Sequence, residues 1–141
     1  GLTGLWFDGA KYFAANLPEE RTEKNTPILA EAARWLDMYF AGRQPDFTPP
    51  LHLVGSDFRR RVWKRLLEIP YGQTAAYGEL LGGSVSAQAV GGAVGHNLIS
   101  IIVPCHRVIG ANGSLTGYAG GIEKKRRLLA LEGVDTTRIS D

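Results

Sequence analysis

The chain has 141 residues, 44% hydrophobic and 21% charged, a composition typical of globular proteins that excludes wholesale disorder. Its single cysteine cannot form an internal disulfide, and no apolar run reaches the roughly 18 residues of a membrane span. We therefore expect a reduced, cytoplasmic protein that does not enter a membrane.

The net charge of +2 is unevenly divided along the chain. Residues 1–50 hold five Lys/Arg against seven Asp/Glu, whereas residues 51–141 hold eleven against seven. The basic clusters are "RRRVWKR" at 59–65 and "KKRR" at 124–127. This asymmetry suits a C-terminal half that faces a polyanion, although basic runs on helices are usually solvated faces.

The first 50 residues contain signals for a strand, a helix and a linker. Alternation around Asp8-Gly9 predicts a hairpin, and the start of the chain inside this strand suggests that the natural protein begins earlier. Thr26-Pro27 predicts the start of a helix that ends at Gly42. Three prolines in residues 43–50 predict a linker. The helix face expected to be buried consists of Leu29, Ala32, Ala33, Leu36 and either Tyr39 or Phe40.

The second half is predicted to be mainly helical. Ser56 or Asp57 is expected to cap a helix that Pro70-Tyr71-Gly72 breaks. A short helical turn over 74–83 and a small-residue helix ending before Asn97 form the outline of a helix-turn-helix. Residues 99–104 are expected to be a buried strand or extended segment, followed by a glycine-rich loop and a terminal helix closed by Gly133. The apolar stripe of the first of these helices is Phe58, Val62, Leu66 and Ile69.

These elements predict an α+β fold. Residues 1–50 would form a small, partial N-terminal α/β domain. Residues 51–141 would form a mainly helical C-terminal domain with a helix-turn-helix and short strands.

The chemistry of the chain centres on its only thiol, Cys105, in "IIVPCHRVIG". A free thiol with a pKa of about 8.5 needs a base or a positive neighbourhood to act as a nucleophile. His106 follows it, but adjacent side chains of an extended segment point to opposite faces, so His106 would act through one water, with Glu132 fixing its tautomer. From the residues alone, a lone cysteine is more often a small buried hydrophobe than a nucleophile.

Metal and nucleotide cofactors are not expected. His52, His96 and His106 are scattered and give no ligand spacing with one cysteine. The glycine-rich segments lack the signature of a phosphate-binding loop.

The segment "PCHR", preceded by "AVGGAVGHN" and followed by "GSLTGYAGG" and "LLALEG", resembles the O-6-alkylguanine-DNA alkyltransferase family over about residues 51–141. Residues 1–50 resemble the family's more variable N-terminal domain without its first strands. The resemblance implies a monomer that binds duplex DNA, extrudes an alkylated guanine and moves the alkyl group to the cysteine. Its substrate would be 6-O-methylguanine, with 4-O-methylthymine as a further candidate.

The resemblance also implies catalytic roles for matching residues. Cys105 would be the nucleophile and His106 the water-linked base, oriented by Glu132. Asn97 would be the hinge between the DNA-binding helix and the cysteine segment. Tyr77 would crowd the target's phosphate and donate its hydroxyl to the base. Outside the motif, Tyr77 could be an ordinary half-buried aromatic, Asn97 a helix cap, and Glu132 a solvated residue.

The extruded base would be held by a second set of residues. Tyr118 and Val94 would form pocket walls, and the backbone N–H of Ala119 would lie near the guanine oxygen. Carbonyls of Val108 and Cys105 would accept from the guanine amine. Tyr118 alone could equally be a half-buried aromatic, and Arg107 is expected to buttress the loop through a carboxylate.

The DNA-binding helix departs from the family pattern. Ala87, Ala89 and Gly91 are small enough for close approach to a groove, or simply for tight helix packing. Gln88 stands where many members have an intercalating arginine, so weaker DNA binding is expected. The spacing from Tyr77 to Gln88 is short, and we expect missing residues around Gly82-Gly83.

An S-alkylcysteine is a thioether without a carbonyl for water to attack, so the expected reaction is a single-turnover (suicide) transfer. Three alternatives remain: a lesion-binding relative without chemistry, a helix-turn-helix regulator with a sensor cysteine, and a cysteine hydrolase. Relatives of the first kind lack the cysteine, and a regulator would need a base-reading helix, for which Gln88 alone is poor. A hydrolase would turn over repeatedly.

Overall fold

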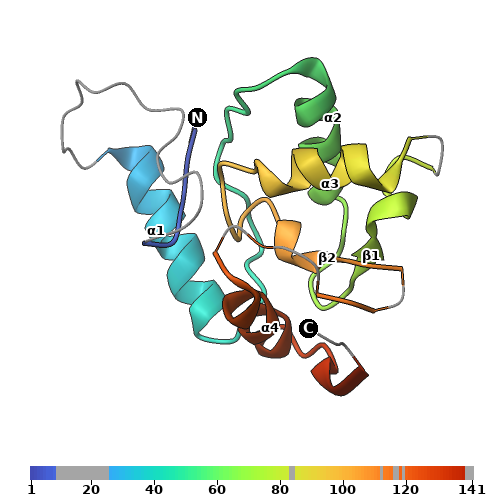
Figure 1. Ribbon diagram of the computed structural model, residues 1–141. Coiled ribbons are helices and arrows are strands. Elements are labelled where there is room, and N and C mark those ends of the chain that lie inside the picture. The colour runs from blue at the N-terminus through green and yellow to red at the C-terminus, as the bar shows by residue number, and fades with distance from the viewer. Residues whose placement is uncertain (9–25, 83–84, 112, 116–117, 119, 139–141) are drawn as a thin grey trace.

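The computed structural model describes residues 1–8, 26–82, 85–111, 113–115, 118 and 120–138 (Figure 1). The predicted α+β class is confirmed, because helices are combined with a small parallel sheet in which Ala75 pairs with Val108 and Ala76 with Ile109. In chain order the elements are α1 (Pro27–Phe40), α2 (Asp57–Leu66), β1 (Ala75–Ala76), the 3-10 helix η1 (Tyr77–Glu79), α3 (Ala87–Gly95), the 3-10 helix η2 (Cys105–Arg107), β2 (Val108–Ile109), α4 (Ile122–Leu131) and the 3-10 helix η3 (Thr136–Arg138).

Helix α1 begins as the sequence predicts. The Thr26 hydroxyl accepts a hydrogen bond from the backbone N–H of Leu29 at 3.3 Å, and Pro27 occupies the first turn, where its missing N–H costs nothing. The helix ends at Phe40, two residues before the predicted end, and Gly42 adopts a φ of +80°.

The predicted buried face of α1 is partly wrong. Leu29 is 46% exposed and Phe40 is 52% exposed, and Ala33 is exposed as well. The side chains that pack inward are Ala32, Trp35 and Tyr39, with Leu36 half-buried. Trp35 and Tyr39, four residues apart, are buried on the same side as Ala32, so the inward face of the helix is turned away from Leu29.

The N-terminal segment is extended and lies across the start of the C-terminal half. Leu2 forms a parallel bridge with Leu51, and Leu5 forms one with Ile99. The backbone N–H of Leu5 donates to the carbonyl of Leu98 at 2.8 Å. Residues 43–50 form no helix or strand, as expected for the linker. The predicted hairpin continues at Gly9, outside the described residues, and stays a prediction.

Helix α2 is fixed at its start by Ser56, whose hydroxyl accepts from the N–H of Arg59 at 3.2 Å. Trp63, at the centre of the helix, donates from Nε1 to the carbonyl of Ala93 in α3 at 2.9 Å. Helices α2 and α3 therefore pack as a unit, with η1 beside them (Figure 1). The helix-turn-helix outline is present, although its first helix is a single 3-10 turn. The predicted stripe is confirmed: Val62, Leu66 and Ile69 are buried, and Phe58 is half-buried.

The segment 99–104 is buried as expected, but it is not a strand. Only Ile99 makes a bridge, and Ser100 to Val103 form tight turns. The N–H of Ile102 donates to the carbonyl of Ser100 at 2.8 Å, and the N–H of Val103 donates to the carbonyl of Ile99 at 3.1 Å. The β-branched residues predicted an extended run, but hydrogen bonds within the segment fold it back on itself.

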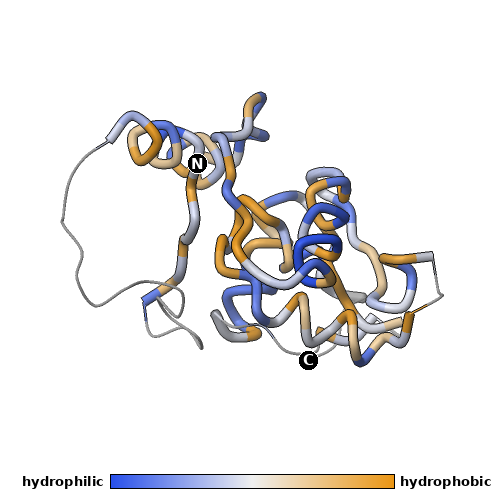
Figure 2. Tube along the Cα trace, turned by 90° about the horizontal axis from the view of Figure 1, so that it is seen from above, coloured by the Kyte–Doolittle hydropathy of each residue, from blue (hydrophilic) through white to orange (hydrophobic). Residues whose placement is uncertain are grey.

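Both halves contribute to one core. Seen from above, α1 lies to one side of the remaining helices (Figure 2), and its buried face packs against them. Ala32, Trp35 and Tyr39 belong to the same buried cluster as Val62, Leu66 and Val103. The division into domains at residue 50 stays a prediction. No helix in the described part of the chain is long and apolar enough to cross a membrane.

Candidate functional site

Cys105 lies at the start of η2, immediately after the buried turns, and is 5% exposed. The backbone enters these turns through Ile101, which has a φ of +70°. This left-handed conformation is rare for a β-branched residue and marks a constrained backbone. The position of the thiol is therefore determined by the turns and not by a strand.

Asn97 closes these turns with its side chain. Its Nδ2 donates to the carbonyl of Val103 at 2.8 Å and to that of Ile99 at 3.3 Å, while Oδ1 accepts from the N–H of Ile99 at 3.0 Å. Asn97 is itself buried. The predicted hinge position is thus a hydrogen-bonded clamp between the end of α3 and the cysteine segment, and not a solvent-facing helix cap.

The surroundings of Cys105 act on its pKa in opposite directions. Burial raises the pKa of the thiol, since a thiolate loses hydration there. A hydrogen bond from Asn97, the positive charge of Lys125 and the backbone N–H groups of Cys105 and His106 lower the pKa. The thiol consequently needs a proton acceptor, while groups that would stabilise its anion are already in place.

His106 and Glu132 form a buried pair. Nε2 of His106 lies 2.6 Å from Oε2 of Glu132, and both side chains are fully buried. Burial lowers the pKa of His106, against the contribution of the carboxylate, so the ring is held neutral near pH 7. Its Nδ1 is buried without a hydrogen-bond partner among the described residues. A neutral ring whose Nε2–H donates to Glu132 leaves Nδ1 as a lone-pair acceptor.

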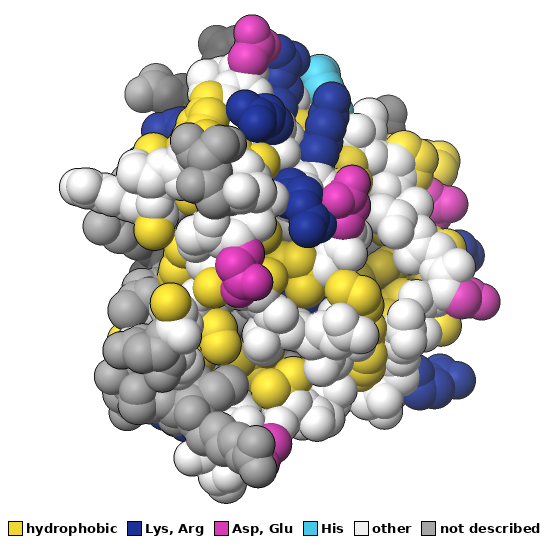
Figure 3. Space-filling view, turned by 90° about the vertical axis from the view of Figure 1, so that its right-hand side faces the viewer, with side chains coloured by type: hydrophobic (Ala, Val, Ile, Leu, Met, Phe, Trp, Pro, Cys, Tyr) yellow, Lys and Arg dark blue, Asp and Glu magenta, His cyan; other side chains and the backbone are white. Residues whose placement is uncertain are grey.

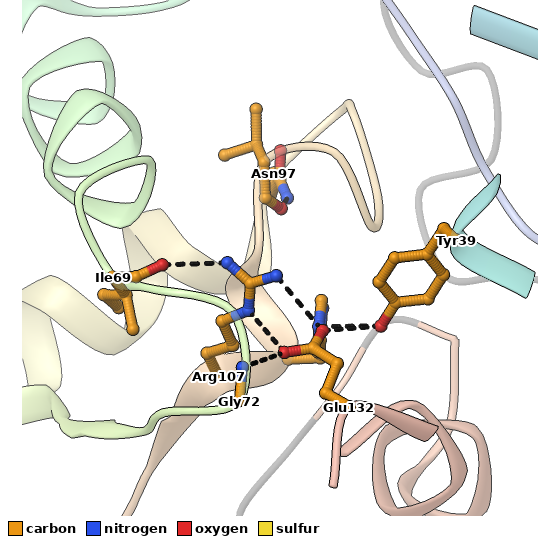
Figure 4. A network of polar contacts seen from close by, with 8 residues as sticks. Tyr39, Ile69, Gly72, Asn97, Arg107 and Glu132 are labelled. Carbon is orange, nitrogen blue, oxygen red and sulfur yellow. Dashed lines mark hydrogen bonds and ion pairs between the residues drawn. The ribbon is translucent and has the colours of Figure 1, made fainter. Parts of the chain in front are cut away.

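Glu132 is the centre of a wider network, shown in Figure 4. Arg107 donates from Nε to Oε1 at 2.8 Å and from Nη2 to Oε2 at 3.2 Å, and the N–H of Gly72 donates to Oε1 at 2.9 Å. The Tyr39 hydroxyl donates to Oε2 at 2.6 Å. Burial alone would raise the pKa of Glu132, but the bonds from His106 and Arg107 lower it to about 2.

Arg107 has the buttressing position predicted from the sequence. Besides Glu132, it donates from Nη1 to the carbonyl of Ile69 at 2.8 Å. It therefore connects η2 to the segment after α2 and to the end of α4.

Tyr77 lies at the start of η1, beside α3. A Cβ placed on Gly91 would meet its ring at 3.7 Å, which is ordinary van der Waals contact. Lys125 Nζ lies 3.5 Å from the Tyr77 hydroxyl. The pairing of β1 with β2 brings this tyrosine toward the cysteine segment, because β1 directly precedes η1 and β2 directly follows η2.

The predicted pocket residues are only partly described. Val94 and Val108 are buried, and Tyr118 is half-buried with its ring edge-on to Phe7 at 6.3 Å. Burial raises the pKa of Tyr118, and the charge of a Cys105 thiolate would raise it further. Ala119 lies outside the described residues, as does Gly83 of the expected break near 82–83.

The start of α3 presents the predicted DNA-facing residues to solvent. Ala87, Gln88 and Ala89 are exposed, and Ser86 caps the helix by accepting from the N–H of Ala89 at 3.2 Å. Beside them, α2 carries a basic groove. Figure 3 shows Lys and Arg side chains gathered over this helix, at the top of the view. The groove is lined by Asp57, Arg60, Arg61, Lys64, Arg65, Glu68 and Leu81.

Two residues of the site were missed by reasoning from the sequence. Lys125, in "KKRR", was assigned to a basic surface cluster, but it is fully buried and desolvation lowers its pKa to about 8. Its place on the apolar side of α4, one turn before Leu128 and Leu129, was the available signal. Tyr39 was treated only as part of a packing face. Nothing local in the sequence indicates its contact with Glu132.

No group of His, Cys, Asp or Glu side chains that could hold a metal ion occurs in the ranges that the structure describes.

Comparison with known proteins supplies the family context. Residues 57–134 match the family "6-O-methylguanine DNA methyltransferase, DNA binding domain", and residues 1–53 match "6-O-methylguanine DNA methyltransferase, ribonuclease-like domain". A methylated-DNA–protein-cysteine methyltransferase of Mycobacterium tuberculosis is 60% identical over 100 residues, covering 69% of this chain and 61% of the relative. The inducible enzyme of that name in Bacillus subtilis is 44% identical over 125 residues, which cover 86% of this chain and 68% of that relative. The chain thus spans under two thirds of the length of the mycobacterial relative.

Solved structures give the same result for the fold. The M. tuberculosis OGT in complex with DNA is 47% identical, with a TM-score of 0.78 over 98% of this chain and 82% of that chain. The S. pombe Atl1, in complex with damaged DNA containing O6-carboxymethylguanine, is 34% identical, with a TM-score of 0.50 over 58% of this chain and 82% of its own.

Proposed function

The chain belongs to the 6-O-methylguanine DNA methyltransferase family, and we propose that it repairs DNA by moving the alkyl group from the 6-oxygen of guanine to Cys105. One observation carries this proposal: His106 is hydrogen-bonded through Nε2 to Glu132 at 2.6 Å, and its Nδ1 has no partner among the described residues. A histidine held in this tautomer directly after a lone cysteine is suited to act as a base.

The proposed reaction begins with loss of the thiol proton. Cys105 gives its proton through one water to Nδ1 of His106, and the resulting imidazolium is stabilised by Glu132. The sulfur then attacks the alkyl carbon in line: the S–C bond forms while the C–O bond to guanine breaks. The departing electron pair remains on the purine, and the Tyr77 hydroxyl donates to the base to offset the developing charge.

The extruded base would occupy a pocket beside the thiol. Tyr118 would offer an aromatic face and Val94 an apolar wall, while the carbonyls of Val108 and Cys105 would accept from the guanine amine. The N–H of Ala119 would lie near the guanine oxygen. Extrusion is needed because the target atom is inaccessible inside a base stack.

The proposed partner is duplex DNA containing an alkylated guanine, bound by a monomer. Support comes from the small residues at the start of α3, of which Ala87 and Ala89 are exposed and Gly91 is half-buried, and from the M. tuberculosis OGT that was solved with DNA. The basic groove on α2 supplies positive charge next to this helix, where phosphates would lie. Gln88 would fill the space left by the base without adding charge.

The transfer would be stoichiometric, because the thioether product offers water no electrophilic carbonyl. 4-O-methylthymine is a second candidate substrate. A single cysteine that must stay reduced suits the cytoplasm.

A lesion-binding protein without chemistry is the second candidate, since the Atl1 match was solved with damaged DNA. The presence of Cys105 with its His106–Glu132 pair favours transfer over binding alone.

In the test, the protein is mixed with excess duplex DNA containing one 6-O-methylguanine, and the mass of the intact protein is measured by mass spectrometry. A single added CH2 on Cys105, absent in Cys105→Ser, supports the proposal. Binding of the duplex without an adduct would favour the lesion-binding alternative, and repeated turnover would favour a hydrolase.

A further inference from the structure

Helix α1, in the N-terminal half, reaches the candidate relay with one side chain. The Tyr39 hydroxyl donates to Glu132 Oε2 at 2.6 Å and lies 3.3 Å from His106 Nε2. The same carboxylate oxygen also accepts a hydrogen bond from His106 Nε2 at 2.6 Å. Tyr39 and His106 therefore share one acceptor atom.

Packing fixes this hydroxyl closely. Tyr39 is fully buried, and its ring stacks on Trp35 at 5.2 Å with an interplanar angle of 9°. The rings of Tyr71 at 6.1 Å and His106 at 6.3 Å meet it edge-on. A buried aromatic in such a cage has few rotamers, so the position of its hydroxyl is determined by the core shared between the two halves of the chain.

We propose that Tyr39 is a positioning residue for alkyl transfer: its hydroxyl holds the Glu132 carboxylate and shares its charge with His106, so that the N-terminal half sets the basicity of the histidine. This inference rests on the proposed function, because it assigns Tyr39 to the relay that serves Cys105. Tyr39 acts through Glu132 and does not touch the substrate.

The direction of the effect follows from the charges around His106. Lys125 faces it from α4, Glu132 from the residue after that helix, Arg107 from η2, and Tyr39 from α1, with Tyr71 behind Tyr39. Glu132 is the group that raises the pKa of His106, whereas burial, Arg107 and Lys125 lower it. A donor on Oε2 draws negative charge away from the bond to His106. Removing that donor leaves a stronger acceptor, which favours the imidazolium.

Tyr39→Phe tests this, because it keeps the stacked ring and removes only the hydroxyl. In the wild type the rate of methyl transfer should fall as the pH drops and His106 becomes protonated. In Tyr39→Phe the pH at which the rate is half its maximum should lie about one unit higher, while the rate well above neutral pH changes little. A defect in folding or packing would lower the rate at every pH. The pKa of His106, followed by nitrogen NMR, should rise by the same amount.

Tyr71→Phe is the matched control, since its ring also lies against Tyr39, but the described contacts include no bond from its hydroxyl to Glu132. Its acid midpoint should match that of the wild type. If Tyr39→Phe is too unstable to assay, 3-fluorotyrosine at position 39 provides a stronger donor and should move the midpoint downward.

An unchanged midpoint in either Tyr39 variant, or an equal shift in Tyr71→Phe, would overturn the inference while leaving the proposed function in place. A wild-type protein that transfers no methyl group would overturn both, so the two failures can be told apart.

Discussion

Asn97 and Val103 are six residues apart and are joined by a 2.8 Å hydrogen bond from the asparagine Nδ2 to the valine carbonyl. Both residues are buried, and between them the chain makes the turns that present Cys105. The hydrogen-bonding pattern, with two donors on carbonyls and an acceptor on the N–H of Ile99, requires a side-chain amide.

Asn97→Ala should therefore reduce the free energy of unfolding by roughly 3 kcal/mol, because buried backbone groups of Ile99 and Val103 lose their partners. It should also slow methyl transfer, since the bond that lowers the pKa of Cys105 disappears. Urea unfolding and transfer rates measure both effects. His96→Ala, one position earlier, is the control: His96 Nδ1 contacts the Gly92 carbonyl within its own helical turn, and a similar loss there would contradict the argument.

Acid stability should depend on Glu132. Its pKa is lowered from 4.5 to about 2 in the folded protein, so the unfolded chain binds the proton first as the pH falls. The stabilisation is fully present above about pH 4.5 and is lost as the pH falls toward about 2. Urea unfolding across this range should show a decline that is reduced in Glu132→Gln.

At neutral pH, Glu132→Gln should cost about 3–5 kcal/mol, because buried Arg107 is left without its countercharge. Glu68→Gln is the matched control. The Arg65–Glu68 pair is exposed, and its loss should cost less than about 1 kcal/mol. Equal losses in the two variants would contradict the assignment.

Lys125→Met should stabilise the protein at pH 7 by about 2 kcal/mol, since a fully desolvated ammonium is replaced by an apolar chain of similar length. The pKa of Lys125 is about 8 in the folded protein and 10.5 when unperturbed, so the free energy of unfolding of the wild type rises with pH over this interval. The variant should lack that rise.

The same variant should transfer methyl more slowly at pH 7, because the charge of Lys125 lowers the pKa of Cys105. Lys124→Met is the control, as Lys124 is only half-buried, with its Nζ 5.0 Å from the centre of the Phe7 ring. A Lys125→Met protein that is less stable than the wild type and transfers the methyl group equally fast would contradict this account.

Ile101 should show an unusual preference for glycine. Glycine normally destabilises by about 0.5–1 kcal/mol relative to alanine, because of its backbone entropy. At a φ of +70° the order should reverse, since the left-handed region costs other residues about 1–2 kcal/mol. Ile101→Gly should therefore be at least as stable as Ile101→Ala in chemical unfolding. A clearly higher free energy of unfolding for Ile101→Ala than for Ile101→Gly would contradict backbone strain at this position.

DNA affinity should respond to charge at position 88. Gln88→Arg should bind duplex DNA more tightly and steepen the slope of log K against log salt by about 0.9, because one more positive charge brought into the duplex releases one more counterion. Gln44→Arg, which adds the same charge at another exposed glutamine beyond α1, should change neither quantity as much. Fluorescence anisotropy across a salt series measures both.

Local signals predicted the helix boundaries well. Thr26, Ser56 and Gly133 act through their nearest neighbours, so their roles follow from spacing alone. The pairing of His106 with Glu132 was predicted as well, from the need for a carboxylate behind the histidine and from the family resemblance, since 26 residues separate them and no local pattern indicates the contact.

What escaped prediction depends on contacts across the fold. Ile101 and its neighbours have strong β propensity, which the Asn97 clamp and the buried turns override. Lys125 belongs to a run of four basic residues, and charge alone gives no indication that one of them points inward. Trp35 and Tyr39 rotate the buried face of α1 because they pack against the C-terminal half, a partner that a helical pattern does not reveal.

The candidate relay joins residues 39, 106 and 132, and its outermost members are 93 positions apart in the sequence. Glu132 comes 26 residues after His106, so the histidine has its carboxylate partner only when α4 is packed against η2. In an unfolded chain the thiol has neither this histidine nor the groups that stabilise its anion, and it is an ordinary free thiol. The surroundings of Cys105 are thus a property of the whole fold, and a change that loosens α1 or α4 reaches the thiol without touching it.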